Sequence, residues 1–174
     1  MRRKPYCYEE DEGIPVELPK RKLVRLPEYD YSSPGAYFIT ICTKDRRCIL
    51  SEITVGADAP GGPCLKLTNT GKVVEHYILS TERINGIHID NFVVMPNHIH
   101  MILRIDNGPP RASAPTISDA VGALKRLVNR RLGHNIWQRS FHEHVIRNEH
   151  DFLEIWEYID ANPAKWAEDC YFGQ

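Results

Sequence analysis

The sequence lacks a long apolar run, a paired set of cysteines and an excess of charge of either sign. No apolar stretch approaches the roughly 18 residues that a membrane-spanning helix needs, so we expect no membrane partner. The five cysteines are scattered without a CxxC pair, which argues against a disulfide framework or a zinc knuckle and predicts reduced thiols in the cytoplasm. The formal net charge of -1 argues against a protein that binds polyanions over its whole surface, so any nucleic-acid contact must come from local patches.

The chain divides into an arm and a domain. Its first residues are basic but run into acidic ones, where a secretory signal would have an apolar stretch. Residues 1–33 mix charges of both signs with prolines that include Pro15, Pro19 and Pro27, and show no sustained hydrophobic period, which predicts an extended arm. With 42% hydrophobic and 26% charged residues, the 174-residue chain has an ordinary globular composition, and we expect residues 34–168 to form one domain.

The hydrophobic pattern of this domain predicts four strands and three helices. Apolar runs rich in β-branched or aromatic residues predict strands at 34–43, 87–95, 98–105 and 141–147. Apolar residues at helical spacing predict helices that start behind Thr70, behind Thr116 or Ser118, and before Phe152, the last ending at Pro163. The order β-α-β-β-α-β-α predicts an α+β fold, with a ferredoxin-like antiparallel sheet, helices on one face and an added C-terminal helix.

Two histidines in the third strand form a candidate metal site. The two-residue period of a strand puts His98 and His100 on one face, opposite the apolar residues, and we expect that face to be exposed. Imidazole binds several divalent metals, so the pair alone does not name one; two polar residues on a solvated face are the alternative. His142 and His144 form a second such pair, for which a hydrogen-bonded or DNA-facing role is favoured, although His144 could turn toward the first pair.

The last predicted helix carries Tyr158 and Asn162, which lie four residues apart and therefore on one helix face. This face borders the apolar stripe, so both side chains could reach across to the sheet. A half-buried tyrosine and a helix-terminal asparagine without chemical function are the alternative.

Several motifs stand in a characteristic order and spacing: Pro-Gly-Ala-Tyr-Phe at 34–38, Pro-Asn-His-Ile-His at 96–100, Trp-Gln-Arg at 137–139 and Tyr-Ile-Asp-Ala-Asn-Pro at 158–163. Together they resemble the REP-associated tyrosine transposases, within the single-tyrosine HUH transposases of insertion sequences. The resemblance extends over residues 21–166. It implies His98 and His100 as ligands of a divalent metal ion, Mg²⁺ or Mn²⁺, and Tyr158 as the nucleophile. Asn162 falls where related transposases carry a glutamine as third ligand, and its side chain is one methylene shorter.

The implied activity is metal-dependent cleavage and strand transfer of single-stranded DNA through a 5′-phosphotyrosine, with hairpin or palindromic repeats as substrate. Relatives differ in oligomeric state, so the resemblance does not decide whether the chain forms a homodimer. Between residues 121 and 147 the basic side chains greatly outnumber the acidic ones, which predicts phosphate contacts. The residues expected to bind DNA are Lys125, Arg126, Arg130, Arg131 and Arg139; a solvated helix face is the alternative.

Three other interpretations remain. A protein of the same fold could bind hairpin DNA without cleaving it, although Tyr158 argues for retained chemistry. A cupin-like barrel could use His98 and His100, but it would need a carboxylate a few residues downstream, where Arg104 and Ile105 stand. A purely structural domain would leave the histidine pair and the tyrosine unexplained.

Overall fold

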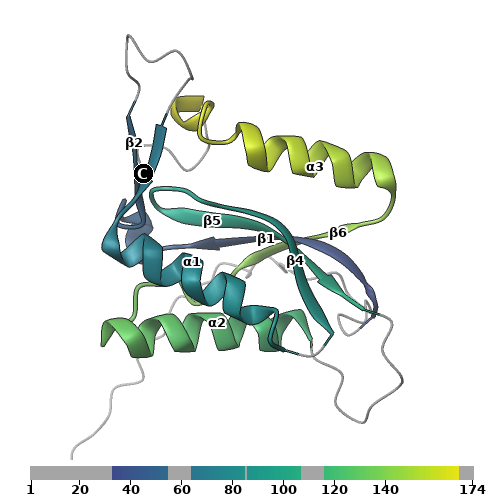
Figure 1. Cartoon of the computed structure of the whole chain (residues 1–174), viewed down its shortest axis with the longest axis horizontal. Coiled ribbons are helices and arrows are strands. Elements are labelled where there is room, and N and C mark those ends of the chain that lie inside the picture. The colour runs from purple at the N-terminus through teal and green to yellow at the C-terminus, as the bar shows by residue number, and fades with distance from the viewer. Residues whose placement is uncertain (1–32, 55–63, 85, 107–115, 169–174) are drawn as a thin grey trace, which may run out of the picture.

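A computed structural model describes residues 33–54, 64–84, 86–106 and 116–168, and shows a four-stranded antiparallel sheet between two layers of helix (Figure 1). The sheet consists of β1 (Gly35–Cys42), β4 (Ile87–Val94), β5 (His98–Ile105) and β6 (His142–Ile146). The strand order is β4-β5-β1-β6, and all neighbours are antiparallel. This is the order of a split β-α-β fold, so the predicted α+β class with an antiparallel sheet is confirmed.

Helices α1 (Asn69–Thr81) and α2 (Ile117–Leu132) cover one face of the sheet and enclose the core (Figure 1). The apolar residues of β5 alternate toward this face, as predicted, and pack against the apolar stripes of both helices. The core includes Ile39, Ile41, Ile99, Met101, Leu103, Val74, Ile78, Val121, Leu124 and Val128.

Local side-chain chemistry sets where these two helices begin. Of the two predicted caps of α2, Thr116 is the one used, and it forms a capping box with Asp119. The prediction that α1 begins behind Thr70 is wrong by two residues. Thr68 is the N-cap, because its hydroxyl accepts from the Gly71 N–H and also donates to the Leu50 carbonyl.

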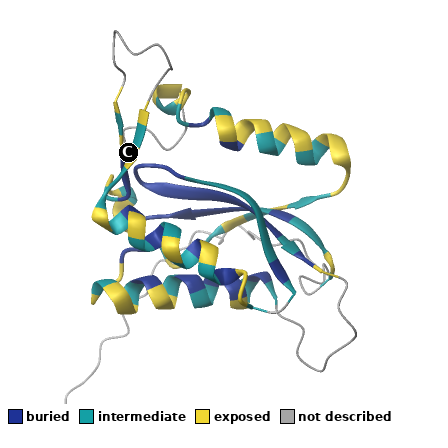
Figure 2. Cartoon of the chain, viewed as in Figure 1, coloured by how far each residue is buried: buried dark blue, intermediate teal, exposed yellow. Residues whose placement is uncertain are grey.

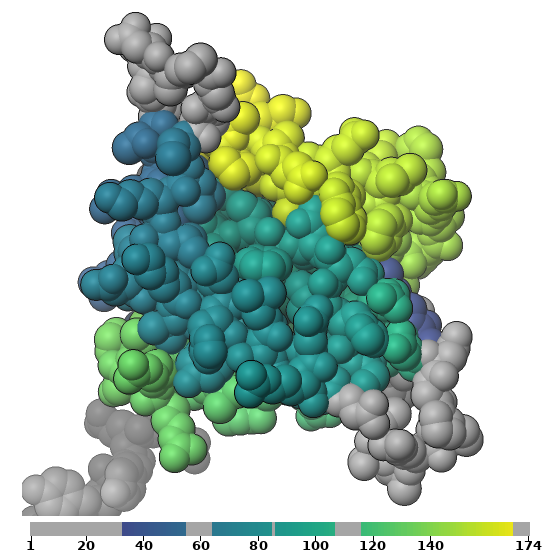
Figure 3. Space-filling model, in the orientation of Figure 1, coloured from purple at the N-terminus to yellow at the C-terminus, as the bar shows by residue number. Residues whose placement is uncertain are grey.

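Helix α3 (Glu149–Ala161) lies on the opposite face of the sheet (Figures 1 and 3). His98 and His100 point to this face, since the His100 ring contacts Tyr158 of α3. The expectation that this face is exposed is wrong, because His98 and His100 are 0% and 2% exposed. Strand β5 is buried along nearly its whole length (Figure 2). The face is covered because α3 and the short helix η2 (Trp166–Glu168) lay aromatic rings over the histidines.

Short elements that the sequence pattern did not predict complete the described part. Strands β2 (Ser51–Thr54) and β3 (Cys64–Leu67) pair with each other as a separate ribbon, and η1 (Lys44–Arg46) follows β1. Four-residue strands are too short to show a reliable period. The predicted arm and the predicted loops at 55–63 and 107–115 lie outside the described residues, apart from Ser33. No helix in the described ranges is long and apolar enough to cross a membrane.

Candidate active site

The two imidazoles of β5 converge through their Nε2 atoms, which lie 3.0 Å apart. Each ring is oriented by a partner on its other nitrogen. His98 Nδ1 lies 2.8 Å from Asn97 Oδ1, and His100 Nδ1 lies 2.8 Å from Thr40 Oγ1. Because an amide oxygen only accepts hydrogen bonds, His98 Nδ1 carries a hydrogen, and Nε2 is the nitrogen of this ring that faces His100.

This geometry fits a shared cation. Two imidazole nitrogens that face each other at 3.0 Å require a hydrogen or a positive ion between them. Two nitrogens that bind one ion at about 2.1 Å each must lie within about 4 Å of each other, and the observed separation of 3.0 Å satisfies this condition. In the parts of the chain that the structure describes, no group of three or more His, Cys, Asp or Glu side chains could hold a metal. A metal here would therefore rely on the two imidazoles together with amide, tyrosine or substrate oxygens.

Burial keeps His100 in the form that binds metals. The pKa of His100 lies well below its ordinary value, first because burial disfavours the charged ring and second because His98 adds a neighbouring positive charge. A neutral imidazole has the lone pair that a metal needs, so no proton has to be displaced from this ring at neutral pH.

Aromatic rings form the walls around the histidines. Phe38 of β1 stacks on His100 with ring centroids 5.0 Å apart, and Trp166 of η2 lies over His98 at 5.9 Å. These contacts exclude water from the imidazoles and explain why polar side chains are buried on this face.

Tyr158 lies between this site and the solvent. Its hydroxyl lies 3.4 Å from His100 Nε2, and its ring packs edge-on against His100 and Phe38. The residue is nevertheless 42% exposed, so a large substrate can reach it. The structure thus brings together the tyrosine and the histidine pair, which are 58 residues apart in sequence.

Asn162 caps the C-terminus of α3, one turn beyond Tyr158, and is 2% exposed. The helix places it on the same side as the tyrosine, and its buried amide is a candidate oxygen ligand.

The predicted DNA-binding residues lie elsewhere. Lys125, Arg126, Arg130 and Arg131 belong to α2, on the face of the sheet opposite Tyr158 (Figure 1). Lys125 is engaged within the protein, because its ammonium donates to the carbonyls of Gln138 and Ser140 at 2.9 Å. Burial lowers the pKa of Lys125 to about 8. Lys125 thus anchors the segment that carries Arg139, and DNA contact by these residues stays a prediction.

Sequence reasoning missed the side chains that orient the histidines. Thr40 reaches His100 only because β1 and β5 pair with Thr40 opposite His100, a register that spacing along the chain does not reveal. Asn97 could have been found, since it directly precedes His98. The second histidine pair does not join the first: His144 Nε2 lies 3.0 Å from Asp151 of α3 instead, and His142 is exposed on β6.

Comparison with known proteins gives several relatives, although no family model matches the chain. A protein of Haemophilus influenzae without a characterised function is 32% identical, over 86% of this chain and 91% of its own length. The REP-associated tyrosine transposase of Escherichia coli K12 is 28% identical, over 78% of this chain and 70% of its own. The solved structure of a REP-associated tyrosine transposase bound to a REP hairpin aligns with a TM-score of 0.60 and 28% identity, covering 81% of this chain and 74% of that one.

Proposed function

Since the chain belongs to the REP-associated tyrosine transposases, we propose that it cleaves and rejoins single-stranded DNA beside a hairpin, with Tyr158 as nucleophile. The observation that supports this most directly is the 3.4 Å contact between the Tyr158 hydroxyl and His100 Nε2. It puts the chain's candidate nucleophile, which is partly exposed to solvent, next to two converging imidazole nitrogens.

In the proposed reaction the Tyr158 oxygen attacks a DNA phosphorus atom. An oxygen–phosphorus bond forms to the tyrosine, and the bond from phosphorus to the 3′ oxygen of the preceding nucleotide breaks. The hydroxyl of Tyr158 gives up its proton and the leaving 3′ oxygen takes one up, so no water or ATP is consumed. The 5′ phosphate remains on Tyr158 as a diester, and a 3′-hydroxyl from a second strand can reverse the step.

The remaining residues orient the site. His98, His100 and the Asn162 amide would hold a divalent ion, which when bound supplies positive charge beside the negative phosphate oxygens. Thr40 and Asn97 hold the imidazole rings so that both Nε2 atoms face the tyrosine side. Phe38 and Trp166 keep water away from the rings.

The proposed substrate is DNA with a hairpin, because the aligned relative was solved with a REP hairpin bound. The exposed guanidinium groups of Arg126, Arg130 and Arg131 could hold phosphates far from Tyr158, on the other face of the sheet. A hairpin that contacted both places would have to pass around an edge of the sheet.

The test uses a pool of 3′-labelled hairpin oligonucleotides whose single-stranded flanks are randomised, incubated with the protein and Mn²⁺ or Mg²⁺. The wild type should produce a labelled adduct that survives denaturation, because the 3′ fragment stays on Tyr158. Tyr158→Phe should bind the pool and form no adduct; Tyr77→Phe, on α1, is the matched control. An adduct with Tyr158→Phe, or a nucleotide mapped to another tyrosine, would contradict the assignment.

His98→Ala and His100→Ala separate chemistry from binding. Both should abolish the adduct, while affinity for the hairpin pool largely survives because phosphate contacts come from arginines elsewhere. If the wild type itself binds hairpins tightly but forms no adduct with any metal, the second candidate function, hairpin binding without cleavage, takes its place.

A further inference from the structure

The apolar side chains of helix α3 are mostly half-buried against the sheet, as Phe152, Ile155 and Trp156 show. Of its thirteen residues only Ile159 is buried. Leu153 and Tyr158 are 54% and 42% exposed. Apolar packing leaves such a helix free to shift or roll, because burial is not directional. Something else must set where the tyrosine stands.

Two polar links tie α3 to opposite edges of the sheet. Near its N-terminus, Asp151 accepts from the backbone N–H of Arg147 and lies 3.0 Å from His144 Nε2 on β6. Near its C-terminus, Asp160 accepts from the Asn91 amide of β4 at 3.0 Å. Because β6 and β4 are the two outer strands, the links span the sheet. Tyr158 lies over β5 between them.

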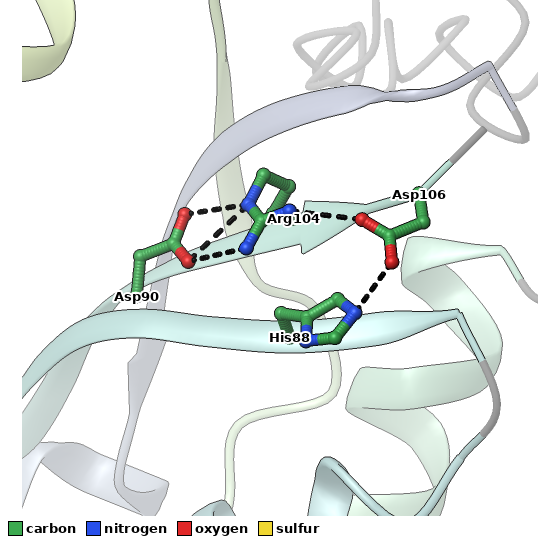
Figure 4. Close-up of polar contacts among 4 residues, drawn as sticks. All are labelled: His88, Asp90, Arg104 and Asp106. Atoms are coloured by element: carbon green, nitrogen blue, oxygen red, sulfur yellow. Dashed lines mark hydrogen bonds and ion pairs between the residues drawn. The ribbon is translucent and has the colours of Figure 1, made fainter.

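A β-bulge directs Asn91 toward the helix. The pairing of β4 with β5 shifts between Ile89 and Asn91, so Asp90 is the extra residue. The bulge is held in turn by Arg104, which donates from Nε and Nη2 to the Asp90 carboxylate at 3.0 and 3.1 Å (Figure 4). Asp106 lies against the other side of Arg104 and also contacts His88 (Figure 4).

We propose that Asp160 with Asn91, and Asp151 with His144, are positioning residues that hold Tyr158 in register with the histidine pair. Asp160 is two residues from Tyr158, so its link fixes the roll of the helix where the nucleophile projects. The bulge and Arg104 extend this support into β4 and β5. This inference rests on the proposed function, since these residues would affect the reaction only by holding Tyr158 in position.

The links should affect rate far more than stability. Both are solvent-exposed hydrogen bonds, which contribute little to folding. The position of Tyr158, in contrast, is critical, since a displacement of about 1 Å at a reacting atom costs about a hundredfold in rate.

The test compares Asp160→Ala, Asp160→Asn and Glu157→Ala, an exposed acidic control on the same helix, using the 3′-labelled hairpin pool. Asp160→Ala should lower the single-turnover rate of adduct formation by about ten- to a hundredfold, with hairpin affinity and melting temperature unchanged. Asp160→Asn should restore most of the rate, because its amide oxygen can still accept from Asn91. Glu157→Ala should match the wild type.

Combining Asn91→Ala with Asp160→Ala should cost no more than either change alone, because both break one link. A wild-type rate in Asp160→Ala, or a loss that Asp160→Asn does not rescue, overturns the inference. If the wild type makes no adduct, the proposed function fails, and hydrogen exchange still tests the links: the amides of α3 must exchange faster in Asp160→Ala than in Glu157→Ala.

Discussion

The Thr40→Val substitution probes the orientation of His100 without touching either imidazole. Thr40 is 3% exposed, and its hydroxyl lies 2.8 Å from His100 Nδ1. Valine keeps the branched shape of threonine and replaces the hydroxyl by a methyl group. The ring therefore keeps its neighbours and loses only the partner of its Nδ1.

The expected magnitude follows from the burial of both groups. A buried nitrogen that loses its partner costs roughly 1–3 kcal/mol in the free energy of unfolding. Metal affinity should fall further than stability suggests, because the hydroxyl also holds the ring in the orientation that directs Nε2 toward His98 and Tyr158. Removing such a supporting partner weakens metal binding by about 10- to 100-fold.

The measurement is calorimetric titration of the protein with Mn²⁺, together with urea unfolding in the absence of metal. Thr81→Val is the control: Thr81 is also buried, but its hydroxyl bonds the Tyr77 carbonyl within α1, on the other side of the sheet. The control should keep the wild-type affinity for Mn²⁺. If Thr40→Val binds Mn²⁺ as tightly as the wild type does, the histidine pair is not the metal site or Thr40 does not orient it.

Three further changes test other parts of the structure. Asn162→Ala should weaken Mn²⁺ binding less than either histidine change does, and an unaltered titration would remove this amide from the ligands. Gly71→Ala should destabilise the fold by about 1–3 kcal/mol in urea unfolding, because its Cβ would overlap the Leu50 carbonyl oxygen; an unchanged midpoint would contradict this packing. The lowered pKa of Lys125, about 8 against an ordinary 10.5, means that the unfolded chain holds more protons between these values. Wild-type stability should therefore rise with pH across this window relative to Lys125→Met, and parallel curves would refute it.

The parts of the fold that follow from regular periods were predictable. Alternation in β5 correctly separated His98 and His100 from the core residues Ile99 and Met101. The same period could not show that α3 and η2 cover the histidines, because covering depends on where a helix docks. Lys125 illustrates a similar limit: its helical position predicted a surface cation, whereas its acceptors belong to a loop that only the fold brings near.

The candidate site depends on contacts that cross long stretches of chain. Tyr158 and Asn162 were chosen from their spacing and from the resemblance, and the structure places the tyrosine beside His100. Thr40 and Trp166 had no local signal, since one acts across a strand pair and the other from a short helix beyond Pro163.

The strand order also has a consequence for folding during synthesis on the ribosome. Strand β1 is the first strand of the sheet to be synthesised, yet its neighbours come much later: Gly35 pairs with Ile105 and Ala36 with Ile146. Until β5 has emerged, an apolar segment that contains Tyr37, Ile39 and Ile41 has neither of its partners. Pairings over such distances close slowly, so we expect the nascent chain to depend on chaperones more than a helical protein of the same length would.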